Sequence, residues 1–281
     1  MTSGPIGVFD SGVGGLSVAR AIRQRLPHED LLYLADTACV PYGDRPESWI
    51  EARSAAIAEL LVHRHAKAIV VACNTATAAA VRSLRARFEV PIVAIEPAVK
   101  VAAETTRAGV VAVLATTRTL SSENFRRLQG LFGEGIAVFA QPCPGLADRV
   151  EAGDLSGPAT RGLLEKYVRP AIACGADTIV LGCTHYSFLT GLIAEIAGPH
   201  VTIVDPAPAV ARQLERRLTE TRVIRSVVPI SHLDECEPKG TDRFLATGPI
   251  EHARRMITEL WLADGACRHE VEVEFVAPVR R

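Results

Sequence analysis

The stretch Ile69-Val70-Val71-Ala72-Cys73-Asn74-Thr75 decides the fold, because it occurs a second time as Ile179-Val180-Leu181-Gly182-Cys183-Thr184-His185. Each copy is a short apolar run rich in β-branched residues, which is typical of a buried strand in a parallel sheet. Each run ends in a cysteine, and a helical pattern begins soon afterwards. Ligands bind at this position in open α/β sheets, just past the carboxyl end of a strand. We interpret the two cysteines as a matched pair, one from each half of a duplicated chain.

A cysteine at the end of an apolar run can also be no more than a small buried hydrophobic residue. The wider context favours a functional pair, because other strand ends recur in the same order. The matched pairs are Asp10-Ser11 with Ala115-Thr116, Asp36 with Gln141, and Glu96-Pro97 with Asp205-Pro206. Chance similarity between ordinary α/β units is the alternative. Two similar halves that face each other would bring both sets of strand ends to one central cleft.

The order of the expected elements predicts an α/β fold. Strands are expected at 6–9, 31–35, 91–95, 110–114, 135–140 and 201–204, in addition to the two before the cysteines, with helices between them. Alternating strands and helices predict parallel sheets with right-handed crossovers. We therefore predict two pseudo-symmetric three-layer α/β domains with mostly parallel sheets and the active site in the cleft between them. The first would comprise 1–97 plus 208–281, with the C-terminal tail packed back on it, and the second 98–207.

Composition and charge exclude several classes of protein. The chain has 281 residues, of which 48% are hydrophobic and 22% charged, with a formal net charge of -1. Without a basic excess or a basic amphipathic face, neither nucleic acid nor a membrane is an expected partner. The seven cysteines form an odd set without a C-x-x-C pair, which argues against both a disulfide framework and a metal site. With no signal peptide or long apolar run in the sequence, we expect a cytoplasmic protein.

The glycine turn Gly12-Val13-Gly14-Gly15 follows the first strand and opens a helix. With Asp36 further on, this arrangement suggests a dinucleotide-binding fingerprint. However, Ser17 stands where the third glycine is expected, and Asp10 would place a carboxylate beside the pyrophosphate. The turn still offers free N–H groups at a helix N-terminus, which suit a carboxylate ligand.

The two cysteines suggest acid–base chemistry at a carbon atom. A thiolate is the active form of cysteine, and a helix N-terminus favours the anion over a thiol whose ordinary pKa is about 8.5. Asp10 and His185 could each serve the thiol on their own side, although Asp10 could also be a helix cap and His185 a structural residue. Two thiols on opposite faces of one small molecule could remove a proton and return one on the far side. No lysine directly follows an apolar strand run, so a pyridoxal Schiff base is not indicated.

The sequence resembles glutamate racemase, of the cofactor-independent aspartate/glutamate racemase superfamily. The motifs that carry the resemblance are Asp10-Ser11-Gly12-Val13-Gly14-Gly15, Pro41-Tyr42-Gly43, Cys73-Asn74-Thr75-Ala76-Thr77 and Gly182-Cys183-Thr184-His185-Tyr186. The resemblance implies interconversion of L- and D-glutamate without a cofactor, a supply of D-glutamate for peptidoglycan, and a homodimer. An aspartate or other amino-acid racemase, a non-catalytic amino-acid-binding module and a NAD-dependent dehydrogenase remain the alternatives.

The resemblance also implies the site residues. Cys73 and Cys183 are the expected acid/base residues, assisted by Asp10 and His185, and Glu151 falls where the family often has a further acidic residue. The expected substrate contacts are Asp10, Ser11, Tyr42, Gly43, Asn74, Thr75, Thr184 and His185. Thr116 is a further candidate donor to the substrate carboxylate, although Ala115-Thr116 departs from the usual Gly-Thr, and Ser187 replaces a common proline. The loop around residues 41–43 is a candidate lid.

Overall fold

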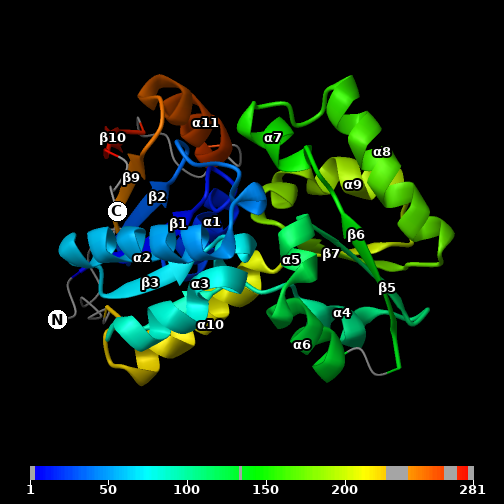
Figure 1. Cartoon of the computed structure of the whole chain (residues 1–281), viewed down its shortest axis with the longest axis horizontal. Coiled ribbons are helices and arrows are strands. Elements are labelled where there is room, and N and C mark those ends of the chain that lie inside the picture. Colours follow the sequence, from blue (N-terminus) through cyan, green and yellow to red (C-terminus); the bar gives the residue numbers. More distant parts are fainter. Residues whose placement is uncertain (1–3, 133–134, 226–239, 263–270, 278–281) are drawn as a thin grey trace, which may run out of the picture.

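The computed structural model describes residues 4–132, 135–225, 240–262 and 271–277, which form two α/β lobes side by side (Figure 1). Each lobe is built on one parallel sheet. The first sheet has the order β10-β9-β2-β1-β3-β4, with strands β1 Ile6–Asp10, β2 Leu31–Ala35, β3 Ala68–Val71, β4 Ile92–Ala94, β9 Asp242–Ala246 and β10 Val273–Phe275. The second has the order β6-β5-β7-β8, with strands β5 Val110–Ala115, β6 Ala137–Pro142, β7 Thr178–Gly182 and β8 Thr202–Val204.

The helices divide into two groups, one for each lobe. Those of the first lobe are α1 Leu16–Arg25, α2 Glu47–His63, α3 Asn74–Arg87, α10 Ala207–Glu220 and α11 Ile250–Leu262, with the 3₁₀ turn η1 Tyr42–Asp44. Those of the second are α4 Val99–Thr105, α5 Thr117–Ser121, α6 Glu123–Phe132, α7 Leu146–Glu151, α8 Pro158–Ala173 and α9 Thr190–Ala197, with the 3₁₀ turn η2 Thr184–Leu189. None of the described helices combines the length and apolarity that a membrane crossing requires.

The two sheets share one topology, as the repeat in the sequence predicts. The strands β2-β1-β3-β4 of the first lobe correspond to β6-β5-β7-β8 of the second, and every pair is parallel. Parallel strands end at the same edge of a sheet, so the residues that follow β1 and β3 lie together, as do those that follow β5 and β7. The predicted tail also packs on the first lobe, where β9 and β10 extend the sheet from β2.

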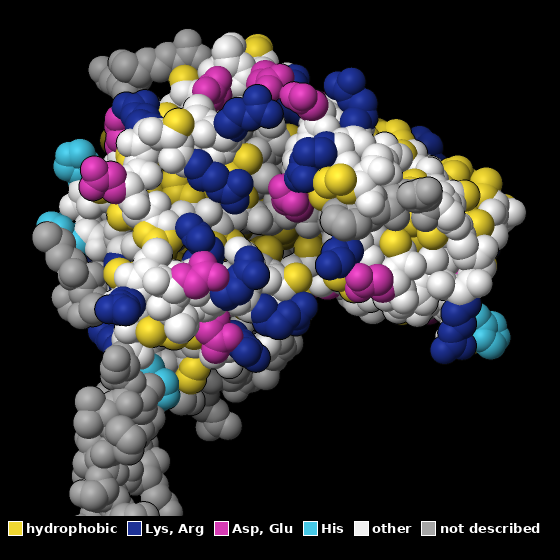
Figure 2. Space-filling model, turned by 90° about the horizontal axis from the view of Figure 1, so that it is seen from below, with side chains coloured by type: hydrophobic (Ala, Val, Ile, Leu, Met, Phe, Trp, Pro, Cys, Tyr) yellow, Lys and Arg dark blue, Asp and Glu magenta, His cyan; other side chains and the backbone are white. Residues whose placement is uncertain are grey.

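Helices cover both faces of each sheet, which explains the near-continuous apolar strands. Neighbouring residues of a strand point to opposite faces. In β1, Val8 therefore packs in the same cluster as Leu16 and Ile22 of α1, whereas Phe9 packs with Ile50 of α2. The second lobe is arranged in the same way, with α4 and α6 on one face of its sheet and α8 and α9 on the other. The outside of the molecule is polar: on the face shown in Figure 2, Lys and Arg side chains are interspersed with Asp and Glu side chains.

Several elements differ from the sequence-based expectation. The sequence predicts one helix at 121–131, which corresponds to α6. A separate short helix, α5, precedes it, because Ser122 is extended (φ −71, ψ 152) and its hydroxyl accepts the N–H of Phe125 at 3.1 Å. The short helices α4 and α7 and the strand β9 were not predicted. Strand β9 begins with two charged residues, Asp242 and Arg243, so its sequence shows no continuous apolar run. Cys236 and Cys267 lie outside the described residues.

Candidate active site

Cys73 occupies the turn between β3 and α3. Its backbone is extended (φ −90, ψ 120), and its Sγ accepts the N–H of Ala76 at 3.4 Å, so the sulfur caps the helix. Serine, threonine and aspartate usually fill this position, because their oxygens accept the free N–H groups of the first turn. The thiol is buried, and it donates to the hydroxyl of Ser11 at 3.7 Å. The chain therefore places a sulfur where a helix N-terminus favours negative charge.

Asp10 ends β1 beside this thiol and is fully buried. Its Oδ2 accepts the N–H groups of Gly12 (3.3 Å) and Gly15 (3.0 Å), so it does hold the glycine turn, as a capping residue would. Its Oδ1 has no partner among the described residues. Burial, opposed by the positive charge of His185, raises the pKa of Asp10. Burial and the charge of Asp10 also raise the pKa of the Cys73 thiol, so that Cys73 keeps its proton at neutral pH.

Cys183 follows β7 in the second lobe and faces a charged histidine. The Sγ of Cys183 lies 3.6 Å from Nδ1 of His185, and Nε2 of His185 lies 2.6 Å from Oε1 of Glu151. Burial lowers the pKa of His185, but the hydrogen bonds to Cys183 and Glu151 outweigh it and raise the pKa well above its ordinary value. The imidazole is therefore protonated at neutral pH, and one of its N–H groups is directed at the sulfur of Cys183.

Glu151 connects the two lobes. Its Oε1 accepts the backbone N–H of Val13 at 2.8 Å in addition to its contact with His185. The approach is so close that a Cβ on Gly12 would lie 1.9 Å from this oxygen, and a Cβ on Gly14 would lie 2.4 Å from Nδ1 of His185. The glycine turn of the first lobe therefore packs directly against Glu151 and His185 of the second lobe.

Polar side chains from both lobes complete the site. Asn74 is buried, and neither atom of its amide group has a partner among the described residues. The hydroxyls of Thr75 and Thr116 lie 3.2 Å apart across the lobes. Thr184 is buried, and its carbonyl accepts the hydroxyl of Ser17 at 3.2 Å. A buried polar group without a partner costs about 1–3 kcal/mol, so the amide of Asn74 and Oδ1 of Asp10 indicate a polar ligand.

Tyr42 and Gly43 lie on η1, at the border between the lobes. The hydroxyl of Tyr42 donates to Oδ2 of Asp36 at 2.6 Å, so this hydroxyl is directed into the first lobe. The carbonyl of Gly43 accepts Nε of Arg118 from α5 at 3.4 Å. The substrate contact expected of this pair would therefore come from the backbone. Asp36 is buried and engaged, so it is not available to the ribose of a dinucleotide.

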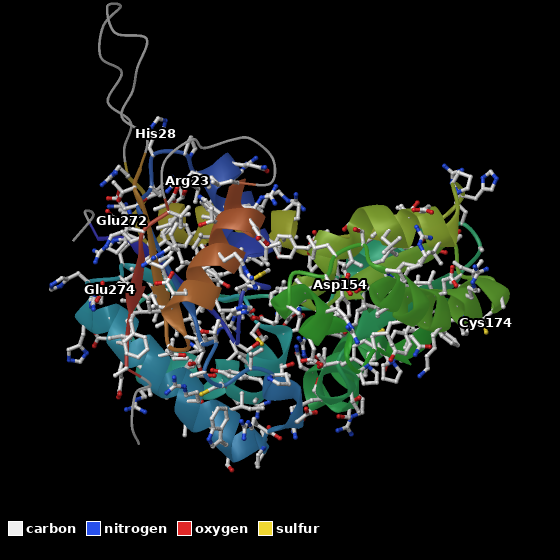
Figure 3. The ribbon with its side chains drawn as sticks, turned by 90° about the horizontal axis from the view of Figure 1, so that it is seen from above. Arg23, His28, Asp154, Cys174, Glu272 and Glu274 are labelled. Carbon is white, nitrogen blue, oxygen red and sulfur yellow. The ribbon has the colours of Figure 1, made fainter. Side chains whose placement is uncertain are left out.

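Sequence reasoning missed three residues that support the site. Tyr33 donates its hydroxyl to the carbonyl of Gly12 at 2.7 Å, Ser17 bonds to Thr184, and Arg118 bonds to Gly43. Tyr33 lies within an apolar strand, where nothing in the sequence distinguishes it from a core residue. The described residues hold three further free thiols: Cys39 is half-buried, Cys143 is buried, and Cys174 is exposed at the far end of the second lobe (Figure 3).

We expect Glu151→Gln to lower the pKa of His185. Burial lowers this pKa, and the variant removes the negative charge of Glu151, which raises it. In an NMR titration, His185 of the wild-type protein should stay protonated through neutral pH, whereas the variant should titrate at lower pH. A raised folded-state pKa stabilises the protein fully below the unfolded value of about 6.5, and this stabilisation is lost as the pH rises through the folded-state pKa. The difference in Tm between the two proteins should therefore be largest at about pH 6 and shrink at alkaline pH. Identical titrations would contradict the assignment.

The chain is similar to known proteins over most or all of its length. The family model described as Asp/Glu/Hydantoin racemase matches residues 12–214. The glutamate racemase of Methylococcus capsulatus is 52% identical over 258 residues, which cover 92% of each chain. The crystal structure of glutamate racemase isoform RacE1 from Bacillus anthracis has a TM-score of 0.84 at 30% identity and covers both chains fully. The Francisella tularensis glutamate racemase in complex with D-glutamate has a TM-score of 0.81 at 26% identity and covers 99% of each chain.

Two similar α/β lobes, each with a buried thiol at the end of its third strand in chain order, match proteins of the racemase class over nearly the whole chain. The thiol of Cys73 caps a helix, and the thiol of Cys183 lies against His185. The chain belongs to the Asp/Glu/Hydantoin racemase family.

Proposed function

We propose that this protein is a glutamate racemase, which interconverts L- and D-glutamate by moving the proton on Cα between Cys73 and Cys183. The observation that carries the proposal is the pair of buried thiols at equivalent strand ends of the two lobes, each with its own ionisable partner. The glycine turn after β1 contacts Glu151 and His185 of the second lobe, which brings the strand end of Cys183 beside that of Asp10. Relatives that cover nearly the whole chain carry the same name, and one of them binds D-glutamate.

The two thiols have different ionisable partners. Cys73 keeps its proton because burial and Asp10 raise the pKa of its thiol. Cys183 receives an N–H of the His185 imidazolium, which stabilises a negatively charged sulfur. We therefore assign Cys183 as the base and Cys73 as the acid for one enantiomer, with the roles exchanged for the other.

The reaction is a balanced pair of proton transfers. The sulfur of Cys183 forms a bond to the α-proton as the C–H bond breaks, and the electron pair moves into the Cα–carboxylate unit. Cys73 then gives its proton to the opposite face of Cα, which produces the mirror-image centre and leaves a thiolate at Cys73. Asp10 and His185 are the groups through which each thiol recovers its starting state, since each lies against its own sulfur.

Stabilising the developing negative charge is the demanding part of this reaction. Preorganised hydrogen-bond donors are most effective when they point at the atoms on which the charge appears. The amide of Asn74, the hydroxyls of Thr75 and Thr116, and the free N–H groups of the first turn of α3 are the donors available for the substrate carboxylate. Oδ1 of Asp10, which is buried and without a partner, suits the substrate ammonium group.

The conversion of one enantiomer of glutamate into the other provides the direct test of this function. The purified protein, without added cofactor, should convert either pure enantiomer of glutamate to an equal mixture, because enantiomers have equal free energy. Chiral chromatography of both reactions measures this, and parallel reactions with L-aspartate test the runner-up substrate. Conversion of aspartate but not of glutamate would favour an aspartate racemase. Binding of glutamate without conversion would favour the amino-acid-binding module.

The biological setting follows from the product. We propose that the enzyme acts in the cytoplasm and supplies D-glutamate for peptidoglycan, that it functions as a homodimer, and that residues 1–97 with 208–281 and residues 98–207 are its two domains. Deletion of the gene should make growth dependent on added D-glutamate. Light scattering at micromolar concentration should give twice the mass of 30.1 kDa that the sequence specifies.

A further inference from the structure

Asp36 lies next to the candidate site, and both oxygens of its carboxylate accept hydrogen bonds. It directly follows β2 and is fully buried. Its Oδ1 accepts Nη2 of Arg53 (2.5 Å) and the hydroxyl of Thr247 (2.6 Å), and its Oδ2 accepts Nε of Arg53 (2.7 Å) and the hydroxyl of Tyr42 (2.6 Å). Four hydrogen bonds thus join one carboxylate to α2, to η1 and to the segment after β9. A buried charge is retained only where it is paired in this way.

The backbone of Asp36 ties this cluster to the catalytic strand end. Its N–H donates to the carbonyl of Asp10 at 3.0 Å, while its own carbonyl accepts the N–H of Cys39 at 2.9 Å. Asp10 is the residue whose side chain serves Cys73. The backbone of Asp36 is therefore fixed relative to Asp10 by this hydrogen bond and by the pairing of β1 with β2.

The loop that Asp36 holds reaches the second lobe. Tyr42 is buried and anchors the turn η1 through its hydroxyl. The next residue, Gly43, lies against the second lobe: a Cβ at this position would be 3.8 Å from Cβ of Thr116, and its carbonyl accepts Arg118. Burial and the negative charge of Asp36 raise the pKa of Tyr42 well above its ordinary value, so the hydroxyl remains a donor.

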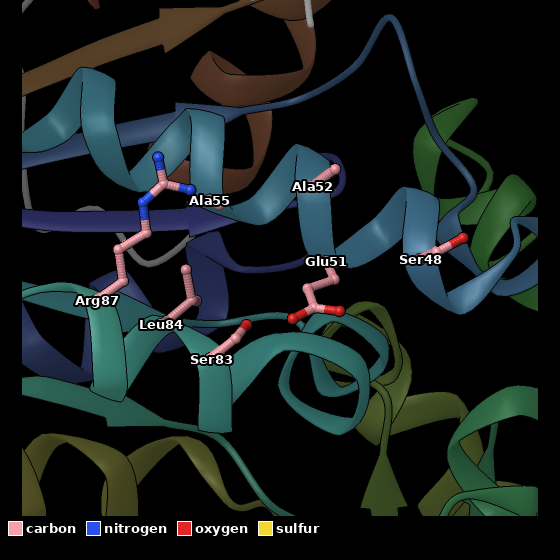
Figure 4. A pocket seen from close by; sticks show the side chains of 7 residues that line it. All are labelled: Ser48, Glu51, Ala52, Ala55, Ser83, Leu84 and Arg87. Atoms are coloured by element: carbon pink, nitrogen blue, oxygen red, sulfur yellow. The ribbon is translucent and has the colours of Figure 1, made fainter.

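Arg53 makes this anchor rigid. Its guanidinium binds Asp36 through two nitrogens, and such bidentate pairs fix orientation as well as distance. Other residues of α2 have a different environment: Glu51, Ala52 and Ala55 line a pocket against Ser83, Leu84 and Arg87 of α3 (Figure 4). Arg53 is 7% exposed and pairs with Asp36 instead.

We infer that Asp36 and Arg53 are positioning residues for the proposed racemase reaction: their buried ion pair holds Tyr42 and Gly43 against Thr116, and so sets the part of the site that binds the substrate. The inference rests on the proposed function for its kinetic consequence. The two residues touch neither thiol, so they act on substrate binding rather than on proton transfer. A lost binding interaction of this kind raises KM and leaves kcat almost unchanged.

Asp36→Asn tests the inference, because it removes the charge while keeping the shape of the side chain. We expect KM for glutamate to rise roughly tenfold to a hundredfold, with kcat within about threefold of wild type. Tyr42→Phe should raise KM in the same way. The double variant should be little worse than Asp36→Asn alone, because Tyr42→Phe removes one contact of a carboxylate cluster that Asp36→Asn has already disturbed. Arg53→Lys, which keeps the charge without the bidentate geometry, should be intermediate.

Glu29→Gln is the matched control. Glu29 forms a buried ion pair with Lys67 at 2.6 Å, and both side chains are 3% exposed. This pair lies at the opposite, amino ends of β2 and β3, in the same sheet. Glu29→Gln should lower Tm about as much as Asp36→Asn but leave KM unchanged. Equal effects of the two variants on KM would overturn the inference, since the effect would then reflect general destabilisation.

Amide hydrogen exchange separates this inference from the proposed function. Exchange across residues 37–46 should accelerate in Asp36→Asn and in Tyr42→Phe, and stay at the wild-type rate in Glu29→Gln. This measurement does not depend on catalysis, so an inactive wild-type protein would refute the proposed function alone. Unchanged exchange in residues 37–46 of both Asp36→Asn and Tyr42→Phe would refute the positioning role, whatever the activity.

Discussion

Replacing either Cys73 or Cys183 by alanine is expected to slow racemisation in both directions by about 10³-fold or more while leaving the protein folded. In the proposed mechanism each thiol serves as base for one enantiomer and as acid for the other, so both directions depend on both thiols. A positioned acid or base contributes about 10²- to 10⁴-fold to a rate, and each variant removes one such group from every turnover. Initial rates with L- and D-glutamate measure the loss, and circular dichroism with Tm reports the fold.

Cys143 and Cys174 provide the controls for this result. Cys143 is a buried free thiol in the same lobe as Cys183, but its sulfur donates to the carbonyl of Gln141 at 3.4 Å and caps no helix. Cys174 is exposed. Alanine at either position should leave kcat within about twofold of wild type, since only a group at the reacting atoms affects proton transfer directly. Substantial activity in Cys73→Ala or Cys183→Ala would refute the assignment of two acid/base thiols.

Gly12→Ala is expected to reduce kcat/KM by about 10²-fold without unfolding the protein. The added Cβ would lie 1.9 Å from Oε1 of Glu151, and the three nearest atoms all belong to that carboxylate. Either Glu151 leaves its hydrogen bonds to Val13 and His185, or the two lobes separate. A misplacement of about 1 Å costs on the order of 10²-fold in rate. The backbone at Gly12 is outside the left-handed region, so alanine introduces no backbone strain.

Gly191→Ala is the matched control for this steric prediction. Gly191 lies on α9 in the second lobe, and a Cβ there would meet nothing within 4 Å. Alanine is also the better helix former, by about 1 kcal/mol. This variant should keep the wild-type rate and gain slightly in Tm. A wild-type rate in Gly12→Ala would mean that Glu151 can leave its place without consequence, and the role of Glu151 between the lobes would be wrong.

The sequence predicted the fold in all but its short elements. The repeated strand before Cys73 and Cys183 was sufficient to predict two similar sheets, because buried parallel strands are continuous apolar runs. Helix α7 was missed because its six residues are too few for a helical period to emerge. The same helix carries Glu151, so the sequence alone could not connect that carboxylate with His185. Strand β9 was missed because only its last three residues are apolar and buried, which is too short a run to indicate a strand.

The parts of the site that could be predicted are those that lie at strand ends. Asp10, Cys73 and Cys183 were identified because each immediately follows an apolar run, where α/β proteins bind ligands. Contacts between the lobes could not be predicted in this way. The bond from Glu151 to Val13 joins residues 138 positions apart, and the bond from Thr247 to Asp36 joins residues 211 positions apart. The sequence marked Asp36 as a strand-end residue and as a possible partner for a ribose, whereas its carboxylate is paired with Arg53 inside the first lobe.

Deuterium incorporation during the first few per cent of turnover tests the central claim most directly. In D₂O, each thiol exchanges its proton with solvent before it delivers one, so the product enantiomer should carry deuterium at Cα from the start. The remaining substrate should stay unlabelled, because the thiol that removes its proton is not the one that returns a proton. This pattern should hold whether the reaction begins with L- or D-glutamate. Early deuterium in the recovered substrate, or protium retained in the product, would show that a single group works on both faces and would contradict the two-thiol account.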